Sequence, residues 1–326
     1  HHLLRRQRQM CIRDRAPATA ALMADIVANS FDAAHFTVVQ GGPEVGQALL
    51  DQNFDAWFYT GSERIGRLYA EAAASHLAPV TLELGGKCPC IIDTEVNLAT
   101  AVDRIIPGKF FNAGQTCMAP DYVLIPDSLH DRFIEEASKI LHELYPESPS
   151  PDLARIVNST HFDRIRALIP ENAIRVGEDD RDDLYLAPAI VPNANKTLPC
   201  MQEEIFGPVL PVVTYRDRTG LFHHLEELTS PLAVYAFSKN DGFLEEIADA
   251  IPSGSICFND VIKQATNLNL PFGGVHQSGM GRYRGEHGFK TFSYERAVTK
   301  RGFSKDMFAI KPPYEGQLQR MRKLLR

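Results

Sequence analysis

Short apolar runs of strand character alternate with helical patterns along most of this chain, and this alternation limits the folds that it can adopt. Strands are expected at residues 36–39, 56–60, 80–84, 89–92, 122–125, 210–215, 232–237 and 255–258. Helices are expected at residues 17–31, 43–50, 63–75, 97–111, 129–144, 220–228 and 241–251. The pattern predicts an α/β fold with a largely parallel sheet covered on both faces, and residues 36–60 are expected to form a βαβ unit.

The size and charge of the chain limit the partners that it can have. A length of 326 residues suits two domains. The formal net charge of −7 argues against binding to nucleic acid or to an anionic membrane, which leaves small molecules as expected partners. No run approaches the roughly 18 consecutive apolar residues of a transmembrane helix, so no transmembrane segment is expected.

The cysteines bear on the compartment and on metal binding. They stand at positions 11, 88, 90, 117, 200 and 257, without a CxxC pair or a spaced set of Cys and His residues. The sequence therefore predicts no disulfide framework and no metal site. A reducing, cytoplasmic location fits this usage best.

The first 16 residues differ from the rest of the chain. Residues 1–15 carry five arginines against one aspartate and show no sustained periodicity. A targeting arm is one interpretation, but a secretory signal has an apolar core and a transit peptide is richer in serine. We expect a non-native leader that takes no part in the fold.

Two segments offer a nucleophile and a base. Cys117 follows a glycine and a short polar run that interrupts an apolar helical pattern, and such a bend can present a sulfur to a cleft. A thiolate is a strong nucleophile once its pKa is lowered. Glu83 ends an apolar strand pattern that stops at a glycine pair. Burial there is expected to raise the pKa of its carboxyl group, so that it can take a proton from water.

A glycine and a serine stand where the 56–60 strand turns into the 63–75 helix. The first turn of a helix leaves backbone N–H groups unpaired, and together with the helix dipole they form a site for an anion such as a phosphate. Gly61 and Ser62 therefore form a candidate phosphate site. Taken alone, the same pair is better interpreted as an ordinary helix N-cap.

Five motifs in a fixed order resemble one enzyme family. They are Tyr59-Thr60-Gly61-Ser62, Leu82-Glu83-Leu84-Gly85-Gly86-Lys87, Gly114-Gln115-Thr116-Cys117-Met118-Ala119-Pro120-Asp121-Tyr122, Gln202-Glu203-Glu204-Ile205-Phe206-Gly207-Pro208 and Pro271-Phe272-Gly273-Gly274. The chain resembles the aldehyde dehydrogenase superfamily over residues 17–311. It is most similar to the class 3 branch, which acts on fatty, aromatic and coniferyl aldehydes, and it lacks the family's N-terminal region.

The resemblance implies a domain plan. Residues 17–86 would be the C-terminal part of a Rossmann-type cofactor domain and residues 87–292 a complete α/β catalytic domain. Residues 293–326 would hold an oligomerisation strand at 294–300 and a tail, so a homodimer is expected. The basic residues 317–326 form an amphipathic helix, for which docking on protein is preferred over weak peripheral membrane contact.

The resemblance also implies a cofactor site for NAD or NADP, without choosing between them. Gly61, Ser62 and Gly66 match the positions that hold the cofactor pyrophosphate. Glu204 and Phe206 match those that bond the nicotinamide ribose and pack on the nicotinamide. For Glu204 the alternative reading is a solvated helix end.

The substrate side is implied in the same way. Phe272 matches the apolar wall of the aldehyde tunnel, with a core aromatic residue as the alternative, and His276 departs from the small residue expected after Gly-Gly-Val. The family's second oxyanion donor is an Asn side chain in a segment that would precede residue 17. Asn112 lies near Cys117 but does not match that position.

The implied reaction oxidises a small-molecule aldehyde to a carboxylic acid. The Cys117 thiolate would form a thiohemiacetal and then a thioester, and Glu83 would activate the hydrolytic water. Two alternatives stay open. One is a catalytically silent fragment that keeps the family fold, and the other is a thiol esterase that works without a cofactor.

Overall fold

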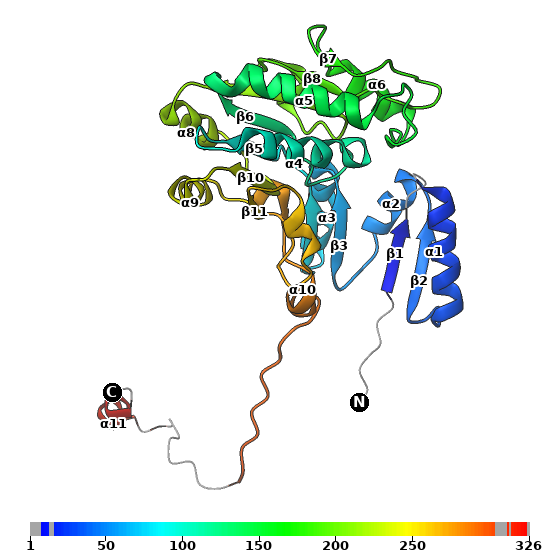
Figure 1. Cartoon of the computed structure of the whole chain (residues 1–326). Coiled ribbons are helices and arrows are strands. Elements are labelled where there is room, and N and C mark those ends of the chain that lie inside the picture. The colour runs from blue at the N-terminus through cyan, green and yellow to red at the C-terminus, as the bar shows by residue number, and fades with distance from the viewer. Residues whose placement is uncertain (1–7, 13–15, 304–311, 313, 325–326) are drawn as a thin grey trace. The chain divides into compact units, whose positions relative to one another are not determined.

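The structure of the chain is a computed structural model, which describes residues 8–12, 16–303, 312 and 314–324. The chain divides into two units, residues 1–292 and residues 293–326, and each is described by itself. Figure 1 labels most of the helices and strands along the chain.

A seven-stranded sheet is the centre of the first unit. Its strands, in spatial order, are β11 (Ser255–Phe258), β10 (Ala233–Phe237), β5 (Pro89–Ile92), β6 (Tyr122–Pro126), β9 (Val209–Tyr215), β8 (Ala189–Val191) and β7 (Ile174–Arg175). All neighbours pair in parallel except the antiparallel pair β7 and β8. The expectation of a largely parallel sheet is confirmed.

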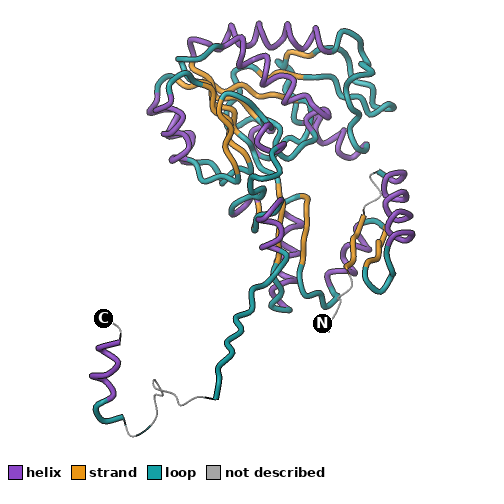
Figure 2. Tube along the Cα trace, turned by 60° about the horizontal axis from the view of Figure 1, so that its bottom comes forward, coloured by secondary structure: helices purple, strands orange, loops and turns teal. Residues whose placement is uncertain are grey.

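Helices cover both faces of this sheet, as the orange strands between purple helices in Figure 2 show. On one face, α4 (Leu98–Phe110) and α5 (His130–Leu144) bury their apolar residues in one core cluster. On the other, α8 (Arg218–Glu226) and α9 (Asp241–Ala250) do so in a second cluster. The central strands are apolar on both sides because both of their faces are covered.

Asn and Asp caps fix where several of these helices begin. In each case the capping side-chain oxygen accepts a hydrogen bond from the backbone N–H three residues later, which satisfies a first-turn donor. The capping residues are Asn97 for α4, Asn158 for α6 (Ser159–Ala167), Asp217 for α8 and Asn240 for α9.

A second, three-stranded sheet carries the strand that ends in the glycine pair. Here β4 (Val80–Leu84) lies between parallel β3 (Trp57–Gly61) and antiparallel β12 (Gly279–Met280). Helix α3 (Glu63–Ser75) covers one face of this sheet, where Tyr59, Leu82 and Leu84 are buried. Alternate side chains of a strand point to opposite faces, so Glu83 points away from α3.

A third, two-stranded sheet shows that the predicted βαβ unit at residues 36–60 does not form. β2 (Phe36–Gln40) pairs in parallel with β1 (Arg8–Ile12), whereas β3 pairs with β4 in another sheet. Helices α1 (Pro17–Ser30) and α2 (Pro43–Leu50) flank β2 along the chain. The βαβ prediction is therefore wrong, because a strand pattern does not identify the strand's neighbour. The leader prediction also did not foresee strand β1.

The remaining elements are short. They are α7 (Pro199–Gln202), α10 (Gly285–Thr291) and the 3₁₀ turns η1 (Phe111–Gly114), η2 (Asp127–Leu129), η3 (Lys263–Thr266) and η4 (His276–Ser278). Strand β4 of the three-stranded sheet ends at Leu84, and β5, the first strand of the seven-stranded sheet along the chain, begins at Pro89. The chain therefore passes from one sheet to the other through residues 85–88, close to the expected domain boundary at 86.

The second unit contains α11 (Gln317–Leu324), within the helix expected at 317–326. Residues 294–300 form no strand in this single chain, so their role as an oligomerisation strand stays a prediction. Across the described residues, no helix has both the length and the apolar character needed to cross a membrane.

Candidate active site

The turn before Cys117 has an unusual backbone. After α4 ends, Asn112, Ala113 and Gly114 have φ values of 51°, 53° and 70°, all in the left-handed region. A Cβ atom on Gly114 would lie 2.2 Å from the Gly207 carbonyl oxygen. Glycine is therefore required there, both for the positive φ and for the close approach of the two backbones. The turn leaves Cys117 partly exposed beside the core cluster under α4.

The Cys117 thiol is protonated at neutral pH in this arrangement. Burial, followed by the charges of Glu204 and Glu83, raises its pKa to about 11. Its own backbone N–H and Arg284 act in the opposite direction but more weakly. Burial and the two carboxylates thus act against the thiolate form that nucleophilic attack requires.

Glu83 is a buried carboxyl group without a hydrogen-bond partner. It is 4% exposed, and neither of its carboxyl oxygens has a partner among the described residues. Burial raises its pKa to about 7, although Arg282 and Arg284 lower it. A Cβ atom on Gly273 would lie 3.0 Å from Glu83 Oε1. Glu83 therefore faces the 271–284 loop, and the direction of its pKa shift agrees with the desolvation expected from sequence.

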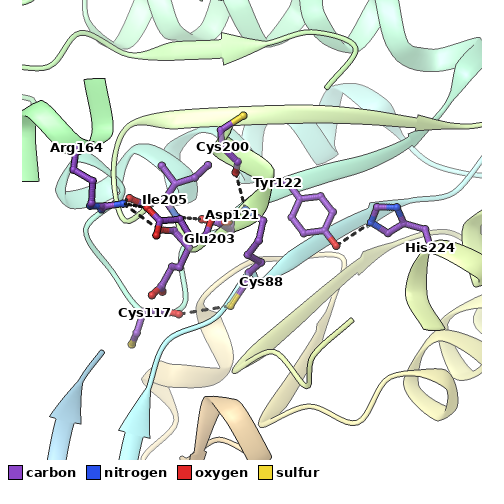
Figure 3. Close-up of polar contacts among 11 residues, drawn as sticks. Cys88, Cys117, Asp121, Tyr122, Arg164, Cys200, Glu203, Ile205 and His224 are labelled. Atoms are coloured by element: carbon purple, nitrogen blue, oxygen red, sulfur yellow. Dashed lines mark hydrogen bonds and ion pairs between the residues drawn. The ribbon is translucent and has the colours of Figure 1, made fainter. Parts of the chain in front are cut away.

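The loop that follows α7 is fixed by polar contacts, most of them at least partly buried. Lys87 forms an ion pair with Asp121 and donates to the Cys200 and Glu203 carbonyls at 2.8 and 3.0 Å. Asp121 in turn accepts a hydrogen bond of 3.0 Å from the Ile205 backbone N–H. Figure 3 shows Asp121, Cys200, Glu203 and Ile205 in the region of Cys117. These contacts tie the segment after β4, the segment after Cys117 and the 203–206 loop together.

This loop places Glu204 against the end of β4. A Cβ atom on Gly85 would lie 2.2 Å from Glu204 Oε2, so only glycine leaves room for the carboxyl group. Burial, reinforced by Asp121, raises the pKa of Glu204 to about 7, and a hydrogen bond from the Gly86 backbone partly offsets the rise. The reading of Glu204 as a solvated helix end is therefore wrong. Phe206, with a left-handed φ of 51°, remains 37% exposed.

The turn between β3 and α3 leaves the first backbone N–H groups of α3 without a side-chain cap. Ser62 caps α3 with extended φ and ψ, and its side chain makes no capping hydrogen bond. A Cβ atom on Gly66 would lie 2.6 Å from Leu84 Cδ2, so Gly66 lets α3 lie close to β4. On Gly61, a Cβ atom would lie 2.1 Å from the Tyr59 hydroxyl oxygen. The two glycines thus keep the turn compact while the start of α3 stays uncapped.

Phe272 lies in the 271–284 loop and packs partly buried against the same core cluster as Cys117. Its backbone exchanges hydrogen bonds of 3.0 and 2.8 Å with Tyr283, and the two rings meet edge to face at 5.4 Å. The Arg284 guanidinium lies 4.1 Å from the centre of the Phe272 ring. Sequence reasoning missed Arg282 and Arg284, because a basic residue in a loop has no periodicity to mark it. His276, which departs from the expected motif, donates or accepts a hydrogen bond of 3.1 Å with Ser230.

No group of three potential metal ligands from His, Cys, Asp and Glu occurs in the described part of the chain. The cysteines described with their side chains are free thiols, of which Cys88, Cys90 and Cys200 are buried and Cys257 is half-buried. They fit the reading of small buried apolar groups better than that of ligands.

Comparisons with known proteins agree with this geometry. The model of the aldehyde dehydrogenase family matches residues 12–298. The chain is 42% identical to the rat protein aldehyde dehydrogenase family 3 member A2, over 87% of this chain and 59% of that protein. The class 3 resemblance is thereby confirmed.

Solved structures show the same fold. The Staphylococcus aureus protein AldH, solved in a substrate-bound state, has a TM-score of 0.91 and 36% identity over 97% of this chain and 70% of its own. A Mycobacterium tuberculosis aldehyde dehydrogenase complexed with NAD⁺ has a TM-score of 0.76 and 28% identity over 86% and 60%. The chain spans about two thirds or less of the curated relatives that it matches, for example 67% and 59% of two of them. Its sequence and fold place this chain in the aldehyde dehydrogenase family.

Proposed function

We propose that the chain oxidises an aldehyde to a carboxylic acid with a nicotinamide dinucleotide as cofactor. The observation that carries the proposal is the pairing of a partly exposed Cys117 thiol with a buried, unpartnered Glu83 carboxyl group near enough to shift its pKa. A carboxyl group with a pKa of about 7 is suited to accept a proton near neutral pH. Family membership supports the same reaction class.

The cofactor turn fits a dinucleotide. The uncapped first turn of α3 supplies N–H donors for a pyrophosphate at Gly61 and Ser62, and Gly66 keeps the helix close to the sheet. Glu204 and Phe206 would hold the nicotinamide ribose and ring beside Cys117. The NAD⁺ complex of the M. tuberculosis relative supports a nicotinamide cofactor, and both NAD and NADP are compatible with these residues.

The residues of the chain divide the chemistry between them. The Cys117 thiol gives its proton to solvent, the thiolate Sγ attacks the aldehyde carbon, and the carbonyl electron pair moves to oxygen. The Cys117 backbone N–H stabilises the resulting thiohemiacetal oxyanion. When bound, the nicotinamide supplies the acceptor for the hydrogen and electron pair that this carbon gives up, which leaves a thioester on Cys117. Glu83 then takes a proton from water, the water oxygen attacks the thioester carbon, and Sγ departs as the acid is released. Phe272 would line the aldehyde's approach to the sulfur.

We further propose the remaining assignments that sequence suggested. The cofactor and catalytic domains would be residues 17–86 and 87–292. Residues 293–326 would supply the strand of a homodimer at 294–300. The compartment would be the cytoplasm.

Formation of reduced cofactor with medium-chain and aromatic aldehydes tests the function. Cys117→Ala is expected to abolish it while cofactor still binds, because the sulfur forms the covalent bond but does not hold the dinucleotide. The Glu83→Gln variant is expected to form about one equivalent of reduced cofactor per chain and then stop, because the thioester forms but water is not activated to hydrolyse it.

The same assay separates the alternatives. A silent fragment would reduce no cofactor with any aldehyde, and a thiol esterase would hydrolyse nitrophenyl esters without cofactor. Turnover by Cys117→Ala within about tenfold of the parent, roughly 1.4 kcal/mol in barrier, would contradict the nucleophile assignment.

A further inference from the structure

Arg284 is a cation beside the proposed reaction centre that the mechanism above does not use. Its charge reaches both Cys117 and Glu83 and lowers the pKa of each group. Arg284 directly follows Tyr283, whose backbone is bridged to that of Phe272. It is therefore held in the same loop as Phe272, the residue proposed to line the aldehyde tunnel.

The Arg284 side chain is positioned but not neutralised. One guanidinium nitrogen donates to the Ala265 carbonyl, and the planar group lies over the Phe272 ring at 4.1 Å and near the Tyr283 ring at 5.9 Å. No carboxylate in the part of the chain that the structure describes forms an ion pair with it. A guanidinium carries five N–H donors in a planar fork that matches a carboxylate.

The neighbouring charges do not supply a partner. Glu83 lies nearby, but neither of its oxygens makes a hydrogen bond or ion pair within the described residues. Arg282 differs from Arg284, because it donates to two backbone carbonyls, those of Gly274 and Gly281. Of the two arginines, Arg284 is therefore the one whose guanidinium, held over the Phe272 ring, is better placed to bind an anionic ligand.

We propose that Arg284 binds an anionic group of the substrate, so that the chain favours aldehydes that carry a carboxylate a few bonds from the carbonyl carbon. This inference rests on the proposed function, which it narrows to a substrate class. An apolar aldehyde in the same position would cover the guanidinium without pairing it, and leaving a charged donor unpaired is costly. Arg284 thus raises the affinity for an anionic substrate and lowers the affinity for a purely apolar one.

Alkylation of Cys117 tests the binding step without cofactor or turnover. Iodoacetate and iodoacetamide have nearly the same shape, but only iodoacetate carries a carboxylate. Arg284→Met is expected to lower the ratio of the iodoacetate rate to the iodoacetamide rate by about tenfold, measured by mass spectrometry of the Cys117 peptide. The ratio cancels any change in the thiol pKa, because that change affects both reagents alike.

Two further variants sharpen this experiment. Arg284→Lys keeps the charge but loses the planar fork, so its ratio is expected to lie between those of the parent and Arg284→Met. Arg218→Met is a matched control, because Arg218 also lies over an aromatic ring, that of Phe243, but is paired with Glu246 on another face of the sheet. A ratio in both Arg284 variants within about twofold of the parent would overturn the proposal.

Turnover gives the second measurement, with 4-carboxybenzaldehyde and benzaldehyde as matched substrates. Arg284→Met is expected to lower kcat/KM for the carboxylated aldehyde about ten- to a hundredfold and for benzaldehyde less than about threefold. An equal fall for both would show that Arg284 acts only through its field on Cys117, and would overturn the substrate class. If the parent oxidises neither aldehyde, the proposed function fails, while the alkylation ratio still decides whether Arg284 attracts a carboxylate.

Discussion

The Cys117 thiol and the nearby carboxyl groups of Glu83 and Glu204 are all at least partly buried, and burial raises the pKa of each. The values are about 11 for the Cys117 thiol and about 7 for the carboxyl groups of Glu83 and Glu204. Because the thiol pKa lies well above that of either carboxyl group, transfer of the thiol proton to a carboxylate is unfavourable. Glu83 is therefore better suited to the water step than to thiol activation.

This argument predicts that removing the Glu83 charge makes the thiol more reactive. Above about pH 7 Glu83 is ionised and opposes the thiolate, so Glu83→Gln lowers the thiol pKa and raises the thiolate fraction. Alkylation of Cys117 by iodoacetamide is expected to be several-fold faster than in the parent at about pH 8.5. At about pH 6 Glu83 is already protonated, so the two rates are expected to converge.

Matched changes give this experiment its controls. Glu204→Gln is expected to accelerate alkylation at least as much, because Glu204 raises the thiol pKa more than Glu83 does. The exposed Glu226, which forms a long contact with His223, serves as a neutral control through Glu226→Gln. Slower alkylation in Glu83→Gln at the higher pH would mean that Glu83 is the base for the thiol itself.

Sequence could predict which residues are reactive but not how they affect one another. The rise in the Glu83 pKa follows from its place at the end of a buried strand pattern, which is local information. The direction of the Cys117 pKa shift did not follow from the sequence, because that direction depends on burial and on Glu204, which reaches the sulfur from a loop far along the chain. Arg284 was missed for the same reason, since only the fold brings it beside Phe272.

At the scale of elements, the nucleophile turn depends on close backbone packing. The left-handed run from Asn112 to Gly114 ends α4 and directs the chain against Gly207. Each left-handed residue that is not glycine costs roughly 1–2 kcal/mol, so tertiary contacts must hold this conformation. The Asn112 side chain contributes by donating to the Gln115 carbonyl at 3.0 Å.

Gly114→Ala is expected to destabilise the fold by about 2 kcal/mol or more. Its methyl group meets a backbone oxygen that cannot move as a side chain would, and φ is positive there. The urea midpoint of unfolding measures the loss. Gly46→Ala is the matched control, because Gly46 lies inside helix α2 with no atom within 4 Å of the added Cβ. That control should be neutral or stabilising by up to about 1 kcal/mol, and an equal loss in both variants would contradict the packing argument.

Local pattern predicts elements better than their pairing. The bounds of α3, β4 and β5 agree with those expected from sequence, because each has a clear period and a capping or glycine boundary. The pairing of β2 was wrong, since strand propensity says nothing about neighbours. β12 is only two residues long and was not foreseen, because it becomes a strand only by lying beside Glu83 and Leu82.

At the scale of the whole molecule, apolar surface remains uncovered on α1. Ala20 and Val27 are buried, whereas Leu22 and Ile26 are 60% and 54% exposed and Met23 is 40% exposed. Residues four apart lie on the same side of a helix, so Leu22 and Ile26 form one patch. Burying such a side chain fully is worth about 1.5–3 kcal/mol, which favours association of the chain with itself.

The chain is therefore expected to form species larger than a dimer at concentrations of tens of micromolar, measured by light scattering after size-exclusion chromatography. Replacing Leu22 and Ile26 together by Gln should reduce these species. The free energy of unfolding should stay within about 0.5 kcal/mol of the parent value, because both side chains are exposed. Leu77→Gln is the control, since Leu77 is 94% exposed in a turn away from α1 and should leave association unchanged. A parent that stays at or below the dimer, or a double variant that associates as the parent does, would show that the α1 patch does not drive assembly.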